Sequence, residues 1–226
     1  MKFNLLAICV LCSFQITIAQ DWANLERFQQ ANDIVMADKT DSTRVVFMGN
    51  SITQDWSEYY PEFFIGKNYI NRGISGQTTS QILLRFRQDV ITLNPRVVVI
   101  LAGINDIAEN NGPIPIEAIA DNIKSMAELA RAHHIEVILC SVLPADDFPW
   151  RKGLEPAEKI VKLNRLMESY AQEQRFEYAD YFTAMADSKN ALKSELGYDG
   201  VHPNKMGYIL MESIIQPIIL KVLQKK

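Results

Sequence analysis

Apolar and polar positions divide this chain into short apolar runs that alternate with longer amphipathic segments. The apolar runs are rich in strand-forming residues and end at turn residues; they cover residues 45–48, 69–71, 97–101, 136–141 and 176–178. Helical periodicity predicts helices over residues 21–37, 56–64, 79–93, 115–133, 156–174 and 205–223. Strands that alternate with helices in this way predict an α/β protein with a parallel sheet covered on both faces.

Two of the predicted strands end in a glycine followed within three residues by a polar side chain. Gly49-Asn50-Ser51 follows the first strand, and Gly103-Ile104-Asn105-Asp106 follows the third. In open parallel sheets, the loops at the carboxyl ends of the strands build the active site. We therefore expect Ser51 and Asn105 to lie at the same edge of the sheet.

A serine, a base and a group that orients the base are all available in the sequence. Serine needs a base to take its proton, and a neutral imidazole is suited to that task. Of the three histidines, only His202 lies outside the predicted helical segment 131–134, and Asp199 precedes it by three residues. Taken alone, the loop Asp199-Gly200-Val201-His202 is more typical of a cap on the final helix. Together with Ser51, it favours a catalytic Ser51, His202 and Asp199.

At these motifs the chain resembles the GDSL-like or SGNH hydrolases, from about Val45 to the final helix. The resemblance rests on four blocks in order: Gly49-Asn50-Ser51-Ile52, Asn71-Arg72-Gly73-Ile74-Ser75-Gly76, Gly103-Ile104-Asn105-Asp106 and Asp199-Gly200-Val201-His202-Pro203. The stretch from Gly73 to Thr79 is most similar to the branch that contains the platelet-activating factor acetylhydrolase subunits. The family usually has Asp where this chain has Asn50, a loop-holding position, so the departure concerns local electrostatics more than mechanism.

The resemblance implies a three-layer α/β/α, flavodoxin-like fold with a five-stranded parallel sheet. It also implies an oxyanion hole made of the backbone N–H groups of Ser51 and Gly76 and the side-chain amide of Asn105. Donors of this kind are what an ester carbonyl needs when a serine attacks it. For Gly76 the residues alone leave open a plain turn glycine, and for Asn105 a loop-bracing amide.

Residues 144–155 are the longest irregular segment between predicted elements. They follow the carboxyl end of the fourth strand, so we expect them to overhang the site. Trp150 and Arg151 in this segment are the predicted substrate-binding residues, because aromatic and arginine side chains are common anchors of recognition. The alternative for Trp150 is packing of the loop onto the body of the protein.

The composition narrows the classes of function. The 226 residues are 48% hydrophobic, which suits one domain, and we expect that domain to span residues 20–226. The net charge of -4 and the scattered Lys and Arg residues give no basic face for nucleic acid. No cofactor or metal is expected, since His133-His134 lacks spaced partner ligands and no glycine-rich phosphate loop with a lysine is present.

The first 19 residues form a separate segment with the pattern of a signal peptide. A lysine precedes an apolar run, and the small residue Ala19 occupies the expected cleavage position. A membrane anchor is the alternative, but the run is shorter than the roughly 20 residues of a spanning helix. We expect a secreted or periplasmic protein without stable membrane insertion after cleavage. Cys140 would then be the one remaining cysteine, and its place in a predicted strand indicates a buried, inert thiol.

The sequence therefore predicts a serine esterase that hydrolyses short-chain esters through an acyl-enzyme on Ser51. No long apolar segment is present to cover a fatty chain, so an acetyl group, borne by a carbohydrate or another small molecule, is the expected substrate. A lipase or thioesterase, and a carbohydrate-binding protein without turnover, are the alternatives. The sequence does not assign an oligomeric state.

Overall fold

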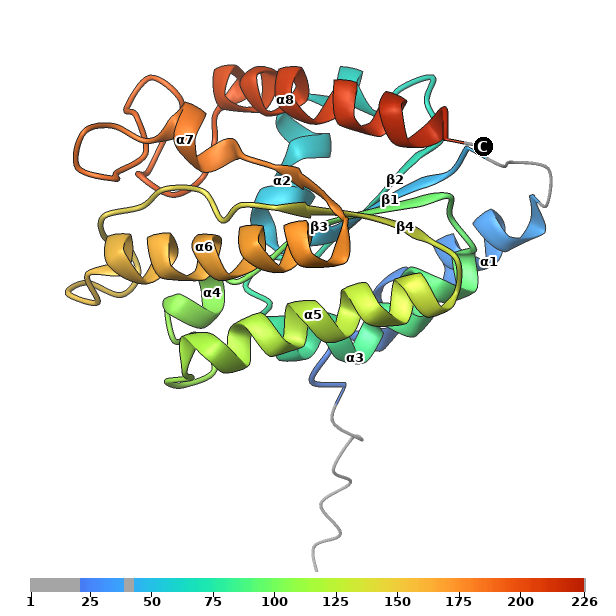
Figure 1. Ribbon diagram of the computed structural model, residues 1–226, viewed down its shortest axis with the longest axis horizontal. Coiled ribbons are helices and arrows are strands. Elements are labelled where there is room, and N and C mark those ends of the chain that lie inside the picture. The colour runs from blue at the N-terminus through green and yellow to red at the C-terminus, as the bar shows by residue number, and fades with distance from the viewer. Residues whose placement is uncertain (1–20, 39–42, 226) are drawn as a thin grey trace, which may run out of the picture.

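The computed structural model describes residues 21–38 and 43–225 (Figure 1). The predicted signal peptide, residues 1–19, lies outside the described residues. The sheet has five strands, all parallel to their neighbours, in the order β2-β1-β3-β4-β5. They are β1 (Val45–Gly49), β2 (Tyr69–Gly73), β3 (Val97–Leu101), β4 (Glu136–Cys140) and β5 (Glu177–Ala179). The predicted five-stranded parallel sheet is confirmed.

Helices cover both faces of this sheet (Figure 1). On one face lie α1 (Gln29–Ala37), α3 (Thr79–Asp89), α5 (Ile116–Ala132) and α6 (Pro156–Gln174). On the other lie α2 (Ser51–Tyr59), α7 (Tyr181–Met185) and α8 (Lys205–Leu223). Short 3-10 turns occur at Leu25–Phe28, Pro61–Phe63 and Ile91–Leu93. The arrangement confirms the three-layer α/β/α fold.

The register of the central strands brings their loops together. Gly49 at the end of β1 pairs with Gly73 of β2 on one side and with Leu101 of β3 on the other. Every residue of β1 and β3 is buried, as expected for strands covered on both faces. Because these three strands end in line, the three loops that follow them start from one edge of the sheet.

Three helices differ from the predicted positions, and the reasons are local. Helix α3 ends at Asp89, four residues before the predicted end at residue 93, and the chain continues in the 3-10 turn Ile91–Leu93. Helix α2 begins at Ser51, five residues before the predicted start at residue 56, because the side chain of Asn50 accepts the N–H of Ile52 and caps the helix. The same helix ends at Tyr59, because Pro61 starts a 3-10 turn. Helix α1 is preceded by a 3-10 turn and begins at Gln29 rather than at residue 21.

Helix α8 is long and apolar enough to cross a membrane by length and composition, with a mean hydropathy of 1.5. In the fold, it packs against α2, α7 and the strands β3, β4 and β5. Its buried positions recur every three or four residues; they are Gly207, Tyr208, Met211, Ile215, Ile219 and Val222. This periodicity is that of a helix that packs one face against the layered fold.

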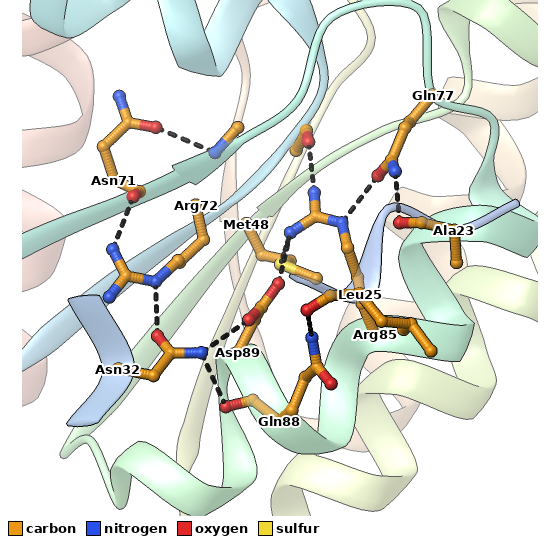
Figure 2. Close-up of polar contacts among 12 residues, drawn as sticks. Ala23, Leu25, Asn32, Met48, Asn71, Arg72, Gln77, Arg85, Gln88 and Asp89 are labelled. Atoms are coloured by element: carbon orange, nitrogen blue, oxygen red, sulfur yellow. Dashed lines mark hydrogen bonds and ion pairs between the residues drawn. The ribbon is translucent and has the colours of Figure 1, made fainter. Parts of the chain in front are cut away.

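A cluster of buried polar side chains lies between the sheet and helix α3 (Figure 2). Arg85 on α3 is fully buried and forms an ion pair with Asp89 one turn later, at 2.9 Å. Asn32 on α1 donates to the same carboxylate at 2.7 Å and accepts from the Nε of Arg72 at 2.9 Å. Burial lowers the pKa of Arg72 to about 10, so this side chain is still a cation at neutral pH.

Replacing Asp89 with Asn should destabilise the fold strongly. The substitution removes the carboxylate that is bonded to Arg85, and an unpaired buried charge of this kind costs roughly 3–5 kcal/mol of unfolding free energy. Urea unfolding measures the difference. Asp121→Asn is the matched control, because its exposed carboxylate pairs with Lys124 on a helix surface, and it should change little. Equal, small effects of the two substitutions would contradict this account of the cluster.

Candidate active site

Ser51, His202 and Asp199 form one continuous hydrogen-bonded chain. The Oγ of Ser51 lies 3.0 Å from the Nε2 of His202, and the Nδ1 of His202 lies 2.7 Å from the Oδ2 of Asp199. The other carboxylate oxygen of Asp199 accepts the backbone N–H groups of Val201 and His202 at 2.9 and 2.7 Å. The structure therefore brings together the three residues predicted to be catalytic, in the order that proton transfer from a serine requires.

The charge on Asp199 is favoured by its surroundings. Burial raises the pKa of this carboxyl, but hydrogen bonds from the backbone and ring of His202 and from the N–H of Val201 hold it below its ordinary value. Asp199 is thus ionised at neutral pH and can accept the Nδ1–H of the imidazole. This interaction leaves Nε2 as the unprotonated nitrogen that faces Ser51.

Ser51 owes its position to the tight turn between β1 and α2. As the first residue of α2 it has a backbone N–H with no acceptor within the helix. A side chain at Gly49 could not be accommodated, because a Cβ there would lie 2.1 Å from the Oγ1 of Thr53 and 2.6 Å from the carbonyl oxygen of Leu101. This turn places the Ser51 hydroxyl and the positive end of α2 at the same point.

Gly76 lies on the loop after β2, and Asn105 lies in the one-turn helix α4 (Ile104–Ile107) that follows β3. Gly76 is exposed and has a φ of +77°, a conformation that favours glycine, and within the described ranges no group accepts its N–H. Its carbonyl oxygen instead accepts from the amide of Asn110 at 3.2 Å. The buried amide of Asn105 donates to the carbonyl of Gln77 at 3.0 Å, which leaves its second N–H without an acceptor among the described residues. Asn105 thus braces the loop, and its role as an oxyanion donor stays a prediction.

Gln77 connects this site to the buried polar cluster (Figure 2). Its side-chain oxygen accepts from the Nε of Arg85 at 2.6 Å, and its side-chain nitrogen donates to the carbonyl of Ala23 at 2.7 Å. Arg85 also donates to the carbonyl of Gly49 at 2.9 Å. The same guanidinium therefore holds the turn before Ser51 and the loop residue that orients Asn105. The sequence did not single out Gln77 or Arg85, because nothing in the pattern shows that they are buried.

Asp106 is a further structural residue, to which the sequence analysis assigned no role. Its carboxylate accepts the backbone N–H of Thr79 at 2.9 and 3.1 Å and the hydroxyl of Thr79 at 2.6 Å, at the start of α3. Burial raises the pKa of Asp106 to about 6, although the bonds from Thr79 act in the opposite direction. Asp106 thereby ties the loop after β3 to the helix that follows Gly76.

The predicted substrate-binding residues lie on the irregular segment 144–155, which contains no helix or strand. The ring of Trp150 is 45% exposed and lies 5.9 Å from the ring of His202, so this segment does border the site as predicted. Arg151 instead bonds to the carbonyl and the carboxylate of Glu109, at 2.8 and 3.2 Å. Its guanidinium is thus engaged by the protein, and a role in substrate binding stays a prediction.

Cys140, His133 and His134 are the other side chains whose reactivity the sequence analysis considered. Cys140 is buried at the end of β4, and burial raises the pKa of its thiol to about 12, so the predicted inert character fits its environment. His133 and His134 follow the end of α5. Across residues 21–38 and 43–225, no group of three or more His, Cys, Asp or Glu side chains is arranged to hold a metal ion.

The blocks that build this site fall within a known protein family. The model of the GDSL-like lipase/acylhydrolase family matches residues 47–210, which include Ser51, Gly76, Asn105, Asp199 and His202. The chain belongs to this family. The resemblance predicted from the sequence is thereby confirmed.

Relatives of this GDSL-family chain include enzymes with named substrates. Platelet-activating factor acetylhydrolase IB subunit alpha2 of Homo sapiens is 25% identical over 203 residues, which cover 87% of this chain and 84% of that protein. Acetylxylan esterase of Geobacillus stearothermophilus is 24% identical over 163 residues, covering 67% of this chain and 71% of that enzyme. A solved GDSL-like lipase from Bacteroides thetaiotaomicron is 46% identical with a TM-score of 0.86, covering 89% of this chain and 99% of that one.

We expect Gln77→Ala to lower kcat by roughly 10-fold to 100-fold on a simple acetyl ester, with a much smaller change in KM. The substitution keeps the backbone carbonyl of Gln77 that accepts from Asn105, but it removes the side chain that anchors this residue to Arg85 and Ala23, so the amide of Asn105 is no longer held in place. A single oxyanion donor contributes on the order of 10² to 10³ in kcat. Gln88→Ala is the matched control, because Gln88 also bonds to the N-terminal segment, at Leu25, without contacting Asn105. Equal kinetic losses in the two variants would show that Gln77 has only a structural role.

The raised pKa of Asp106 predicts a specific pH dependence of stability. The folded protein binds the proton of the Asp106 carboxyl more tightly than the unfolded chain does. The protonated carboxyl therefore stabilises the folded state below about pH 4, and this stabilisation is lost as the pH rises through about 6. Two pKa units correspond to about 3 kcal/mol. Asp106→Asn lacks this titration. Its free energy of unfolding minus that of the wild type should therefore rise by about 3 kcal/mol from pH 4 to pH 7. A difference that does not vary with pH would contradict the assignment.

Proposed function

We propose that this protein is a serine esterase that removes short acyl groups, acetyl above all, from hydroxyl-bearing substrates. The observation that carries the proposal is the unbroken contact from the Ser51 Oγ through His202 to Asp199, with distances of 3.0 and 2.7 Å. A non-catalytic binding protein has no need for a serine held against a base. The family provides the reaction class, since its members are lipases and acylhydrolases.

The first step is acylation of Ser51. His202 takes the hydroxyl proton on Nε2 while Oγ attacks the ester carbonyl, and the carbonyl oxygen becomes an oxyanion. The carbon–oxygen bond to the alcohol then breaks, and His202 returns the proton to the departing alkoxide. Asp199 stabilises the imidazolium during this transfer and is itself never protonated.

The second step is hydrolysis of the acyl-enzyme. A water molecule gives its proton to Nε2 of His202 and attacks the acyl carbon. Collapse of the second oxyanion releases the carboxylic acid and returns the proton to Ser51. In both steps the backbone N–H groups of Ser51 and Gly76 and the free amide N–H of Asn105 are the proposed donors to the oxyanion.

An acetyl ester of a carbohydrate is the proposed substrate. An acetylxylan esterase and a platelet-activating factor acetylhydrolase subunit are both relatives, and the name of each specifies an acetyl group. The sugar is supported by the exposed ring of Trp150 beside His202. We further propose that residues 1–19 are a signal peptide, so that the enzyme would meet its substrate outside the cytoplasm.

Ser51→Ala and His202→Ala should each abolish nearly all hydrolysis of p-nitrophenyl acetate without loss of melting temperature. The double variant should be little worse than either single one, because nucleophile and base act as a unit. Ser213→Ala and His133→Ala, on α8 and after α5, are matched controls and should retain wild-type rates. Losses that multiply in the double variant would show that Ser51 and His202 do not act in the same step.

A further inference from the structure

Four aromatic rings form a row across the candidate active site, with His202 inside the row. The ring centres of Tyr59 and Tyr198 lie 5.8 Å apart. The ring centres of Tyr198 and His202 lie 5.7 Å apart, and the planes of these two rings are nearly parallel, at 11°. On the other side of His202, the ring of Trp150 lies at 5.9 Å. We call Tyr59, Tyr198 and Trp150 the aromatic strip. Its members come from helix α2, from the loop before α8 and from segment 144–155, so only the fold brings them together.

The aromatic strip is open to solvent. Tyr59, Tyr198 and Trp150 are 47%, 53% and 45% exposed. The indole N–H of Trp150 donates to Asn110 at 3.1 Å, and the hydroxyl of Tyr198 lies near Asp55 and Tyr59. What these side chains offer to a ligand is therefore mainly ring surface. Exposed rings beside a reactive group are a recognition feature, because large apolar surface left in water favours association.

A carboxylate lies at the edge of the strip. Asp55 is on α2, one turn after Ser51, and is partly buried near His202 and Asp199. Burial raises the pKa of Asp55, while the positive charge of a protonated His202 and the hydroxyl of Tyr198 act to lower it. A carboxylate is an acceptor-only group with capacity for several hydrogen bonds, so it can accept from ligand hydroxyls in addition to Tyr198.

We propose that the aromatic strip and Asp55 form the subsite for a carbohydrate acceptor. A pyranose ring would lay its C–H face on Tyr198 or Trp150, with a hydroxyl donating to Asp55 and its acetyl ester at Ser51. Rings on both sides of His202 would let an oligosaccharide lie across the site, with the acetylated residue in the middle. This inference rests on the proposed esterase function.

An extended acyl chain fits this surface less well. A fatty chain gains most from an enclosed apolar pocket that removes it from water on all sides. Here the rings are about half exposed, and the carboxylate of Asp55 would have to be desolvated against the chain without a hydrogen bond. A sugar satisfies both features at once, because it has an apolar face and a polar rim.

The test compares kcat/KM for acetylated xylotriose, p-nitrophenyl acetate and p-nitrophenyl octanoate across variants of the strip. Tyr198→Ala, Tyr59→Ala and Trp150→Ala should each lower kcat/KM for acetylated xylotriose about tenfold more than for p-nitrophenyl acetate, which corresponds to the loss of one ring contact. Tyr198→Phe keeps the ring and should retain most of the saccharide activity. Ile65→Ala and Leu84→Ala remove exposed apolar side chains elsewhere and serve as controls.

The outcomes separate this inference from the proposed function. Wild-type enzyme that fails to hydrolyse p-nitrophenyl acetate would overturn the proposed function itself. With that activity present, proportional losses on acetylated xylotriose and p-nitrophenyl acetate would show that the strip only supports His202, and the inference would be wrong. The largest loss on p-nitrophenyl octanoate would also overturn it, because the strip would then bind an acyl chain.

Discussion

The arrangement of the site depends on a guanidinium that has no contact with water. Arg85 is fully buried, and each of its nitrogens must therefore find a fixed partner. Those partners are the carboxylate of Asp89, the side-chain oxygen of Gln77, the carbonyl of Gly49 and the sulfur of Met48. Because an unpaired buried cation is costly, the turn before Ser51 and the loop after β2 are both held where Arg85 can bond to them.

The second constraint is the common end point of three parallel strands. Gly49, Gly73 and Leu101 are in register, so the loops that carry Ser51, Gly76 and Asn105 begin side by side. Short hydrogen bonds then fix the positions of the residues that the strands have brought together. Preorganisation of this kind matters for acyl transfer, since donors already in place need no rearrangement when the oxyanion forms.

The sequence predicted what depends on local pattern or on recognisable chemistry. The five strands were placed to within two residues at each end, because their apolar runs are bounded by turn residues. Ser51, Asp199 and His202, which the structure places in contact, could be proposed from the sequence because a nucleophile, a base and its orienter have distinctive chemistry. The helices α4 (Ile104–Ile107) and α7 were not predicted, since four or five residues are too few to show helical periodicity.

Residues whose importance arises from tertiary packing could not be found in this way. In the sequence, Arg85 and Gln77 are ordinary polar residues of a helix and a loop, and only the packing of α3 on the sheet buries them. Tyr198 and Tyr59 are far apart in the chain and become neighbours only when the loop before α8 meets α2. The sequence pattern identifies candidate reacting groups, whereas the groups that position them become visible in three dimensions.

The most direct test of the central claim is to identify the residue that forms the covalent intermediate. The folded protein would be incubated with a fluorophosphonate, digested, and mapped by mass spectrometry. The account predicts a single phosphonyl group on Ser51, absent in Ser51→Ala and formed much more slowly in His202→Ala. Labelling of a different serine, or no labelling of folded wild-type protein, would contradict it.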